Sequence, residues 1–371
     1  MLDRSPRVGE AAGSADILFI CADPEALVPP ATQARLLGRM GEPDAGGFDL
    51  LFPVSNESEA PALCRAPSVA YATVSELEEV AAEMAVASEL VPIGAARFPV
   101  FVVRRAALAR VNADRMLADL PEAIASSGGR LAADSGAYVH RYGAMDASVR
   151  ADLVAKIPAG SRRVLDVGCS QGATAPALRS AGVAEIFGIE PDLSDAAKAA
   201  QQYDRVVPLR LDEVREAWDG MFDAVLFGDV LEHLEDPSEA LVRVRSWLSP
   251  RGRLVASVPN FGNWAVIGDL LRGRFDYVPY STLSGTHVRF FTRRTLVDLF
   301  EACGYAIESI DGDPSEPPPA GRALIEKLRS LPEASGDLAV LEFIVVARRS
   351  DGLPGGDMIA NRDQQGRSDR A

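Results

Sequence analysis

Short apolar runs alternate with amphipathic segments of helical length along most of this chain. Between residues 16 and 142, the runs ADILFICAD, FDLLFPVSN and FPVFVVRRAAL predict strands, whereas TQARLLGRM and a segment from Ser75 predict helices. Ser75 and Glu78 have the spacing of a capping box. The apolar stripe of that helix comprises Leu77, Val80, Ala81 and Met84. The pattern is typical of an α/β region in which helices pack on a sheet.

A second α/β pattern begins at about residue 143. The runs RRVLDVG, AEIFGIE, FDAVLFGD and RLVASVPN predict strands separated by helix-length segments, which indicates a parallel arrangement. One helix is expected to end at Gly182, another to begin at Pro237 and close at the turn SPRG, and a third to begin at Thr292. The later runs YAIESID and LAVLEFIVVARR predict two further strands, which makes six, and the fold we expect is a seven-stranded mixed sheet flanked by helices.

These patterns divide the chain into three parts. We expect an α/β region over residues 1–142, a second α/β domain over residues 143–350 and a tail over residues 351–371. The tail has too little apolar content to bury a core, so we expect it to be disordered. The sequence contains no internal repeat that would suggest a solenoid.

Composition narrows the classes of partner and compartment. The formal charge of −15, from 53 acidic and 38 basic side chains, disfavours nucleic acid and anionic lipid as partners. The chain shows no signal-peptide core and no apolar run long enough for a membrane span, so we expect a cytoplasmic protein. The oligomeric state stays open. Free thiols and no metal site are expected, because the close spacing of zinc sites and redox dithiols is missing from the four cysteines, Cys21, Cys64, Cys169 and Cys303.

The run VLDVGCSQGA, residues 164–173, carries the strongest chemical signal. An apolar strand ends in an acidic residue, turns through a glycine loop and enters a helix, whose N-terminus favours a carboxylate or phosphate. Gly168 and Gly172 lack the Cβ atoms that would block the approach of a ligand to the backbone. The next strand ends in Glu190, near the spacing of about twenty residues at which an acidic residue binds ribose hydroxyls. Together these features predict an adenosine-type nucleotide site.

Four segments in order make the match to a known family specific. The runs DVGCSQG, GIEPD, FDAVLFGDVLEHLEDP and LSPRGRLVASVPN resemble class I S-adenosylmethionine-dependent methyltransferases, in the branch related to ubiquinone-biosynthesis O-methyltransferases. The later run THVRFFTRRTLVDLFEACGY is similar to the carboxyl-terminal part of small-molecule and sugar methyltransferases. The resemblance covers about residues 145–349 and implies a Rossmann-like fold with S-adenosylmethionine as cofactor. A nicotinamide-dependent reductase is disfavoured, because the loop lacks G-x-G-x-x-G.

The resemblance implies a role for each position of the cofactor loop. Asp166 and Gly168 would hold the methionine end of the cofactor, and Gly172 would close the loop. Glu190 would accept the ribose hydroxyls. Ser170 stands where this family usually has its middle glycine. With a negative φ the serine is harmless and its hydroxyl could bond the cofactor carboxylate, whereas a positive φ would strain the loop and lower affinity.

Further candidates lie beyond the loop. Asp212 would lie beside the adenine, and Asp229 would lie near cofactor and acceptor unless it only caps the following helix. A hydroxyl acceptor needs a base, and His287 in THVRFF is the best candidate, because its segment is expected to cover the pocket and histidine ordinarily titrates near neutrality. The alternative is a histidine that only orders this segment. His233 is a further candidate for the acceptor site, and the alternative for it and for Glu232 is an ordinary packed helix residue.

Two other groups have weaker interpretations. The arginines that follow His287 could neutralise an acidic or phosphorylated acceptor or form a solvated basic face; they are Arg289, Arg293 and Arg294. Cys169 is expected to be a small packed side chain rather than a nucleophile.

The N-terminal region resembles a different class of enzyme. The runs ADILFICADPEALVPPATQARLL, LLFPVSNES, FPVFVVRRAAL and AYVHRYG look like the second half of a nucleotide-sugar glycosyltransferase of the GT-A fold. Only Asp23 matches the acidic metal-binding motif of that family, and the nucleotide-binding strands that should precede it are absent. We therefore interpret residues 1–142 as a truncated module that could help to bind a glycan. His140 matches a histidine near the metal and diphosphate in that family, and we expect it to be structural here.

These observations predict transfer of a methyl group from S-adenosylmethionine to a hydroxyl of a small molecule or of a sugar in a surface glycan. The sugar hypothesis rests on the glycosyltransferase-like leader. The alternative is a glycan-binding or glycosyltransferase-associated protein whose methyltransferase fold is catalytically silent. Binding of a nucleotide sugar or glycan without use of the cofactor would favour that alternative.

Overall fold

The computed structural model describes most of the chain, in two compact units. The described residues are 16–23, 26–42, 47–56, 58, 63–64, 73–86, 89–111, 117–141, 149–278, 281–314, 317, 319–332 and 335–350. The first unit comprises Met1–Met145, Ala265–Gly285 and Glu316–Gly321, and the second comprises Asp146–Trp264, Thr286–Ser315 and Arg322–Ala371. The predicted tail over residues 351–371 lies outside the described residues. The predicted division at residues 142 and 350 stays a prediction about parts that fold independently.

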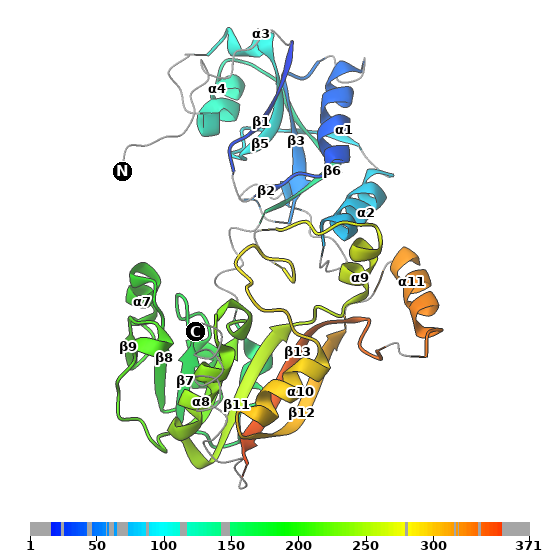
Figure 1. Ribbon diagram of the computed structural model, residues 1–371. Helices are drawn as coiled ribbons and strands as arrows, with labels where there is room; N and C mark the ends of the chain where they lie inside the picture. The colour runs from blue at the N-terminus through cyan, green and yellow to red at the C-terminus, as the bar shows by residue number, and fades with distance from the viewer. Residues whose placement is uncertain are drawn as a thin grey trace, which may run out of the picture. The chain divides into compact units, whose positions relative to one another are not determined.

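The first unit is built on a six-stranded sheet. Its strands are β1 (Ile17–Cys21), β2 (Ala26–Leu27), β3 (Leu50–Ser55), β4 (Leu90–Ile93), β5 (Val100–Arg104) and β6 (Leu131–Arg141), in the order β1-β5-β3-β6-β2 with β4 paired to β6 (Figure 1). Its helices are α1 (Pro30–Gly41), α2 (Val74–Ala85), α3 (Arg105–Leu108), the 3-10 turn η4 (Leu117–Asp119) and α4 (Leu120–Ser126). Strands β3 and β6 run parallel, and the other pairs are antiparallel. The α/β character predicted for this region is confirmed, whereas its likeness to a glycosyltransferase stays a prediction.

Helix α2 begins earlier than its sequence pattern suggested. Thr73 is the N-cap, because its backbone is extended and its side chain accepts a hydrogen bond from the backbone N–H of Glu76. Ser75 lies inside the helix and is buried, so the prediction of a capping box from Ser75 to Glu78 was wrong. The predicted apolar stripe is confirmed, since Leu77, Val80 and Ala81 are buried and Met84 packs against them.

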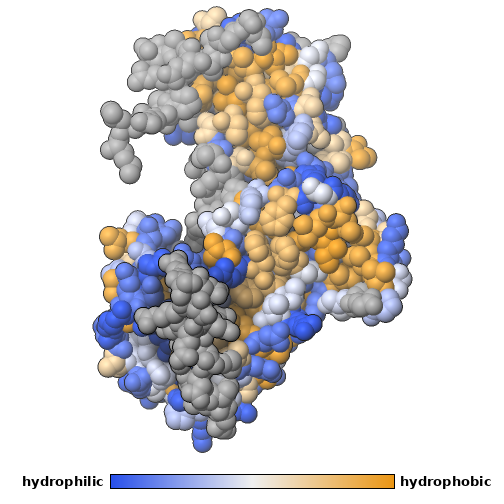
Figure 2. Space-filling view, in the orientation of Figure 1, coloured by the Kyte–Doolittle hydropathy of each residue, from blue (hydrophilic) through white to orange (hydrophobic). Residues whose placement is uncertain are grey.

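Residues 265–285 lie between two segments of the second unit in sequence but belong to the first unit. Helix α9 (Trp264–Leu271) lies at the start of this segment. Arg274 pairs with Glu78 of α2 at 3.0 Å and with Asp276 at 2.7 Å. Leu270 and Leu271 of α9 are exposed, and Figure 2 shows hydrophobic side chains gathered over the region of this helix.

The second unit is built on the predicted seven-stranded mixed sheet. Its strands are β7 (Arg163–Val167), β8 (Glu185–Ile189), β9 (Arg205–Val207), β10 (Phe222–Gly228), β11 (Leu248–Pro259), β12 (Tyr305–Pro314) and β13 (Val340–Arg349), in the order β12-β13-β11-β10-β7-β8-β9. Strands β7 to β11 are parallel, and β13 runs antiparallel between β11 and β12. The helical segments are α5 (Ala151–Val154), α6 (Ala175–Ser180), α7 (Leu193–Ala199), η6 (Leu211–Glu213), η7 (Leu231–His233), α8 (Pro237–Trp247), α10 (Arg293–Ala302) and α11 (Pro319–Arg329).

Local chemistry explains most of the helix boundaries in this unit. Asp236 caps α8 by accepting from two backbone N–H groups, and Pro237 occupies the first helical position, as predicted. Thr292 caps α10, as predicted. Gly182 follows α6 with φ +87°, a conformation that glycine adopts readily. The run SPRG, however, forms the start of β11 rather than a turn, because the strand begins at Leu248 directly after the helix.

The strand order reverses between β7 and β10. The chain passes from β7 outward through β8 to β9, then crosses back to β10 and β11 on the other side. In open α/β sheets, ligands bind outside the carboxyl ends of the strands at such a switch point. The edge formed by the ends of β8, β7, β10 and β11 is therefore where a site is expected. No helix among the described residues is long and apolar enough to cross a bilayer.

Candidate active site

Two glycines shape the loop that follows β7. Gly168 has φ +71°, and a Cβ atom there would meet Val230 Cγ2 at 2.6 Å. Gly172 has φ +84°, and a Cβ atom there would meet the backbone Cα of Ala199 at 2.9 Å. Both positions combine a left-handed backbone with a close neighbour, so only glycine fits without movement of that neighbour. The two glycines therefore let the loop pass close to Val230 and Ala199 at the carboxyl end of β7.

Ser170 and Glu190 join this loop to the end of β8. The backbone N–H of Ser170 donates to Glu190 Oε2 at 2.9 Å, and the N–H of Asp192 donates to Glu190 Oε1 at 2.9 Å. Ser170 has φ +43°, so of the two cases predicted for this position the left-handed one is found. Each carboxylate oxygen of Glu190 has one of its two acceptor positions filled by these bonds. One position on each oxygen remains for a pair of ribose hydroxyls.

Asp166 is the buried acid of the loop. Its side chain lies at the end of β7 and accepts a hydrogen bond of 2.6 Å from the hydroxyl of Tyr203. Burial raises the pKa of Asp166 to about 6, against the opposing effects of the Tyr203 hydrogen bond and the charge of Arg150. Tyr203 itself packs against the Gly172 position, where its ring lies 3.1 Å from the added Cβ atom. No sequence pattern indicated this tyrosine, because it lies in the connection after α7.

Asp229 lies at the carboxyl end of β10 in a network of charges. It has φ +52°, its N–H donates to Ser257 Oγ at 2.9 Å, and Ser257 Oγ donates to its Oδ1 at 2.9 Å. Arg150 pairs with Asp229 and also with Glu342 at 2.6 Å and Asp152 at 2.7 Å. Burial, together with the charge of Asp229, raises the pKa of Glu342 to about 7. The side chain of Asp229 thus bonds Arg150 and Ser257 rather than capping the following turn η7, and its place near cofactor and acceptor stays a prediction.

Sequence reasoning missed Arg150 and Glu342. They lie near opposite ends of the domain's sequence, and only the fold brings them together. The predicted adenine residue Asp212 lies instead on η6, where it is exposed and pairs with Arg210 at 3.3 Å. Its role beside the adenine stays a prediction.

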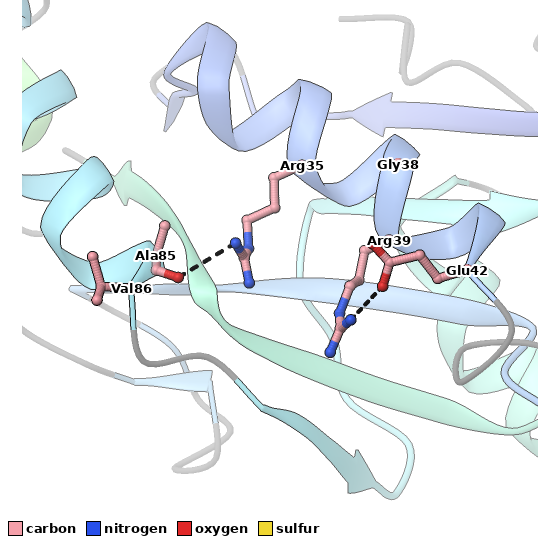
Figure 3. Close-up of a pocket in the computed structure, with 6 residues that line it drawn as sticks. All are labelled: Arg35, Gly38, Arg39, Glu42, Ala85 and Val86. Carbon is pink, nitrogen blue, oxygen red and sulfur yellow. Dashed lines mark hydrogen bonds and ion pairs between the residues drawn. The ribbon is translucent and has the colours of Figure 1, made fainter.

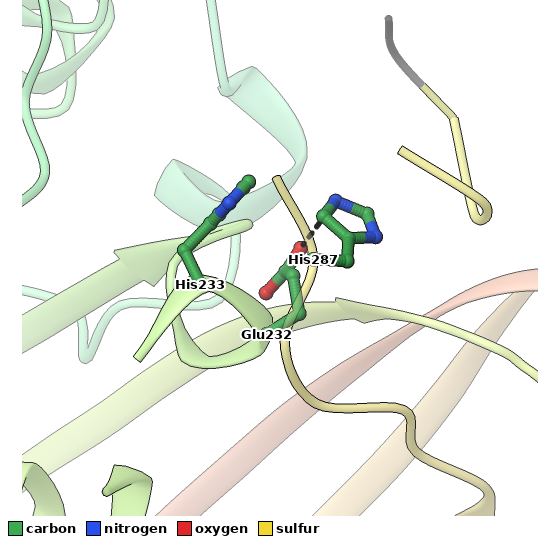
Figure 4. A group of neighbouring side chains, drawn as sticks. All are labelled: Glu232, His233 and His287. Atoms are coloured by element: carbon green, nitrogen blue, oxygen red, sulfur yellow. Dashed lines mark ion pairs between the residues drawn. The ribbon is translucent and has the colours of Figure 1, made fainter. Parts of the chain in front are cut away.

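The acceptor-side candidates lie together after β10. His233 and His287 have ring centroids 4.7 Å apart, and Glu232 Oε1 lies 4.0 Å from His287 Nε2. Figure 4 shows Glu232 and His233 on the turn η7 and His287 on a neighbouring segment of chain. Thr286, next to His287, offers its carbonyl oxygen to His233 Nδ1 at 3.2 Å. The two predicted histidines are thus brought together.

Glu232, for which the sequence had suggested ordinary packing as it had for His233, is the buried acid of this group. Its side chain is 1% exposed, and neither carboxylate oxygen has a hydrogen-bond partner among the described residues. Burial, with a contribution from the charge of Asp229, raises the pKa of Glu232. The prediction of no metal site rested on cysteine spacing, and this group, which could hold a metal ion, uses no cysteine.

The three arginines after His287 have other contacts. Arg293 makes two bonds of 2.8 Å to the carboxylate of Asp337. Arg289 donates to the carbonyl of Glu235, and the side chain of Arg294 is 90% exposed. A structural ion pair and a solvated face account for these residues, and neither requires an anionic acceptor.

The first unit carries one shallow hollow between the ends of α1 and α2. Figure 3 shows Arg35 and Arg39 on α1 near the end of α2, with Arg35 Nη1 donating to the carbonyl of Ala85 at 3.4 Å. Arg35 also pairs with the buried Asp134 at 2.9 Å, so its charge is compensated within the fold.

His140 is buried, and its Nδ1 lies 3.0 Å from the hydroxyl of Tyr138. Burial lowers the pKa of His140 to about 4, which fits its predicted structural role.

The cysteines are all free thiols in the described structure. Cys169 and Cys303 are buried, and Cys21 and Cys64 are exposed. Burial raises the pKa of the Cys169 thiol well above its ordinary value. Cys169 is therefore a packed side chain, as expected, and not an activated nucleophile.

Comparison with known families shows which class of domain this part of the chain resembles. Residues 138–310 match the family model described as a methyltransferase domain. This part of the chain, just under half of its length, is similar to methyltransferase domains. S-adenosylmethionine is the cofactor of this domain class, and the loop described above fits it. Gly168 and Gly172 let the loop turn close to its protein neighbours, and Glu190 keeps one acceptor position on each oxygen for the ribose.

Individual relatives and a solved structure are similar to parts of this chain. A ubiquinone biosynthesis O-methyltransferase of Bradyrhizobium diazoefficiens is 33% identical over 132 residues, which cover 34% of this chain and 51% of the relative. A tRNA U34 carboxymethyltransferase of Citrifermentans bemidjiense is 33% identical over 105 residues, which cover 26% and 32%. The chain spans about half or less of the length of these relatives. The crystal structure of an S-adenosylmethionine-dependent methyltransferase from Archaeoglobus fulgidus aligns with TM-score 0.42 and 18% identity, over 54% of this chain and 91% of the other.

Proposed function

We propose that this protein transfers a methyl group from S-adenosylmethionine to a hydroxyl of a small molecule or sugar. The observation that carries the proposal is the arrangement at the switch point. A glycine loop with an orienting carboxylate lies at the ends of β7 and β8, and a group of proton-accepting side chains lies after β10. The first can hold the nucleoside, and the second lies beside the strand end where an acceptor would be placed.

The cofactor residues act by holding and orienting. Glu190 would fix the ribose through its two oxygens, which the N–H groups of Ser170 and Asp192 already aim. Asp166 would face the ammonium group of the methionine end, and Gly168 would allow the backbone to approach. The cofactor supplies a methyl group activated by its sulfonium, so the protein contributes mainly in-line placement of the acceptor.

Transfer to a neutral hydroxyl also requires that the acceptor lose its proton. Glu232, His233 and His287 are the proton-accepting groups after β10. Asp229 lies before them and is already engaged by Arg150 and Ser257, so its oxygens are suited to positioning rather than to taking up a proton. His287, named as the base from the sequence, and His233 therefore remain the proposed catalytic side chains.

Fewer observations bear on the class of the methyl acceptor than on the cofactor. The resemblance of residues 1–142 to part of a glycosyltransferase favours a sugar, whereas the names of the relatives mention ubiquinone biosynthesis and tRNA. The charge of −15 weighs against a tRNA acceptor. A cytoplasmic location and the absence of a nucleic-acid partner stay predictions.

The test is release of S-adenosylhomocysteine by the full chain with a defined acceptor panel. The panel contains nucleotide sugars and free hexoses on one side and catechol-type quinols on the other. We expect turnover with members of the sugar class. Turnover with quinols alone would contradict the sugar assignment. Binding of a nucleotide sugar without any turnover on either class would favour a silent methyltransferase fold within a glycan-binding protein.

A further inference from the structure

Glu232 poses an energetic problem that its protein neighbours do not solve. The side chain is 1% exposed, and neither carboxylate oxygen has a hydrogen-bond partner in the described part of the chain. Burying a carboxylate without hydrogen bonds costs several kcal/mol unless a positive charge compensates it. His287 Nε2 lies 4.0 Å from Glu232 Oε1, beyond hydrogen-bond distance. A partner that provides positive charge would resolve the burial.

The orientation of His233 points to the nature of that partner. Its Nδ1 lies 3.2 Å from the carbonyl oxygen of Thr286. A carbonyl oxygen only accepts hydrogen bonds, so Nδ1 carries the hydrogen and the lone pair of the neutral ring lies on Nε2. Histidines that bind metals are held in this way, with the second ring nitrogen donating to a carbonyl or carboxylate. Thr286 is the residue before His287, so one short segment contributes a ligand and orients another.

We propose that Glu232, His233 and His287 bind a divalent first-row transition-metal ion. One potential ligand atom from each side chain lies within 4.8 Å of the others. Ligand atoms on a common Zn²⁺ ion lie about 2.0 to 2.2 Å from the metal, so small side-chain rotations would bring these three into contact with it. Two imidazoles with one carboxylate suit Zn²⁺ or Fe²⁺ better than Mg²⁺, which prefers oxygen ligands.

Three protein ligands leave at least one position on the ion open. This part of the inference rests on the proposed function, because an acceptor hydroxyl would take that position. There its O–H bond breaks, and the proton leaves to water or a buffer base. The oxygen keeps the electron pair and forms the bond to the methyl carbon, while the carbon–sulfur bond breaks and its pair stays on sulfur. The two histidines then act as ligands, and the ion supplies the acidity that the hydroxyl needs.

The test is calorimetric titration of Zn²⁺ into the full chain after treatment with a chelator and dialysis. We expect one equivalent to bind, and Glu232→Gln and His287→Gln each to weaken binding by at least 10-fold. Glu239→Gln is the matched control, because Glu239 is an exposed acid on α8 that pairs only with Arg243 in the described contacts, and it should bind like wild type. No stoichiometric binding, or equal binding by Glu232→Gln and Glu239→Gln, would overturn the inference.

A second measurement needs no variant. The chain has three histidines, His140, His233 and His287. In proton NMR spectra of the wild-type protein, Zn²⁺ should shift the ring signals of two histidines at one equivalent and leave the third, the buried His140, unchanged. A shift of all three or of none would contradict the site.

Binding of S-adenosylhomocysteine separates this inference from the proposed function. Glu232→Gln should retain it, because Glu232 does not belong to the nucleoside loop. Nucleoside binding without Zn²⁺ binding defeats the metal site alone. Zn²⁺ binding without nucleoside binding defeats the proposed function and leaves the metal site intact.

Discussion

The backbone N–H of Ser170 lies 2.9 Å from Glu190 Oε2, and this bond joins the loop after β7 to the end of β8, where the N–H groups of Gly168 and Cys169 also donate to the carbonyl of Ile189. It is made by a serine with φ +43°, a left-handed conformation that costs a residue with a Cβ atom about 1–2 kcal/mol. In this strained conformation the N–H of Ser170 orients the carboxylate of Glu190. Where the family usually has glycine, the chain therefore keeps the geometry at some cost in stability.

Ser170→Gly should stabilise the fold. Glycine adopts this φ without strain, and part of the gain is offset by the greater freedom of glycine in the unfolded chain, so we expect about 0.5–1 kcal/mol in the free energy of unfolding. Denaturant titration measures it. Ser180→Gly is the control, because Ser180 lies within α6, where glycine should destabilise by a similar amount. Destabilisation by both substitutions would show that residue 170 is not strained.

Glu190→Ala should weaken binding of S-adenosylhomocysteine by about 1–3 kcal/mol, because the ribose hydroxyls lose a charged partner. Calorimetric titration at fixed salt measures the change. Glu185→Ala serves as control, since Glu185 begins the same strand and pairs with Arg163 at the surface. Equal affinity of wild type and Glu190→Ala would remove Glu190 from the site.

Asp166 should make stability fall as pH rises from about 4 to 6. Burial raises its pKa to about 6, so the unfolded chain releases this proton first and the folded state bears a buried charge only above pH 6. The stabilisation is therefore present below pH 4 and lost by pH 6, and amounts to about 3 kcal/mol. Comparison with Asp166→Asn isolates this part of the pH dependence. Parallel curves for the two proteins would contradict the assignment.

His140 should have the opposite sign. Burial lowers its pKa to about 4, so as pH falls below the ordinary range of histidine the unfolded chain takes up the proton while the folded state does not. Stability of the first unit should fall between about pH 6.5 and pH 4. His140→Gln should flatten the curve in that window, as followed by thermal unfolding. An unchanged slope would mean that His140 is accessible to protons in the folded state.

The sequence predicted the elements whose signals are local. The strands β7, β8, β10 and β11 each end within one residue of their predicted apolar runs, and Pro237 and Thr292 mark helix starts by their own chemistry. Ser170 could be recognised as a departure from the family pattern, but the sign of its φ depends on the loop's path and needed the structure.

Other features follow from long-range packing. The pairing of Arg150 with Glu342 joins residues 192 positions apart, and no periodicity records it. Glu232 lies in a segment whose sequence is compatible with ordinary packing. Only the structure shows that its carboxylate is buried without hydrogen bonds and lies beside His287. Helix α2 was predicted to begin at Ser75 from the spacing of Ser75 and Glu78. The structure has Thr73 as the N-cap, a residue that caps in the same way and lies one half-turn earlier.

The most direct test of the central claim is calorimetric titration of S-adenosylhomocysteine into the full chain, with NADH as the control ligand. The account predicts saturable binding of S-adenosylhomocysteine at one site, weaker binding by Glu190→Ala, and no binding of NADH, whose pyrophosphate needs a glycine pattern that this loop lacks. Absence of S-adenosylhomocysteine binding to the folded wild-type chain would contradict the account and would mean that the loop no longer serves a methyltransferase.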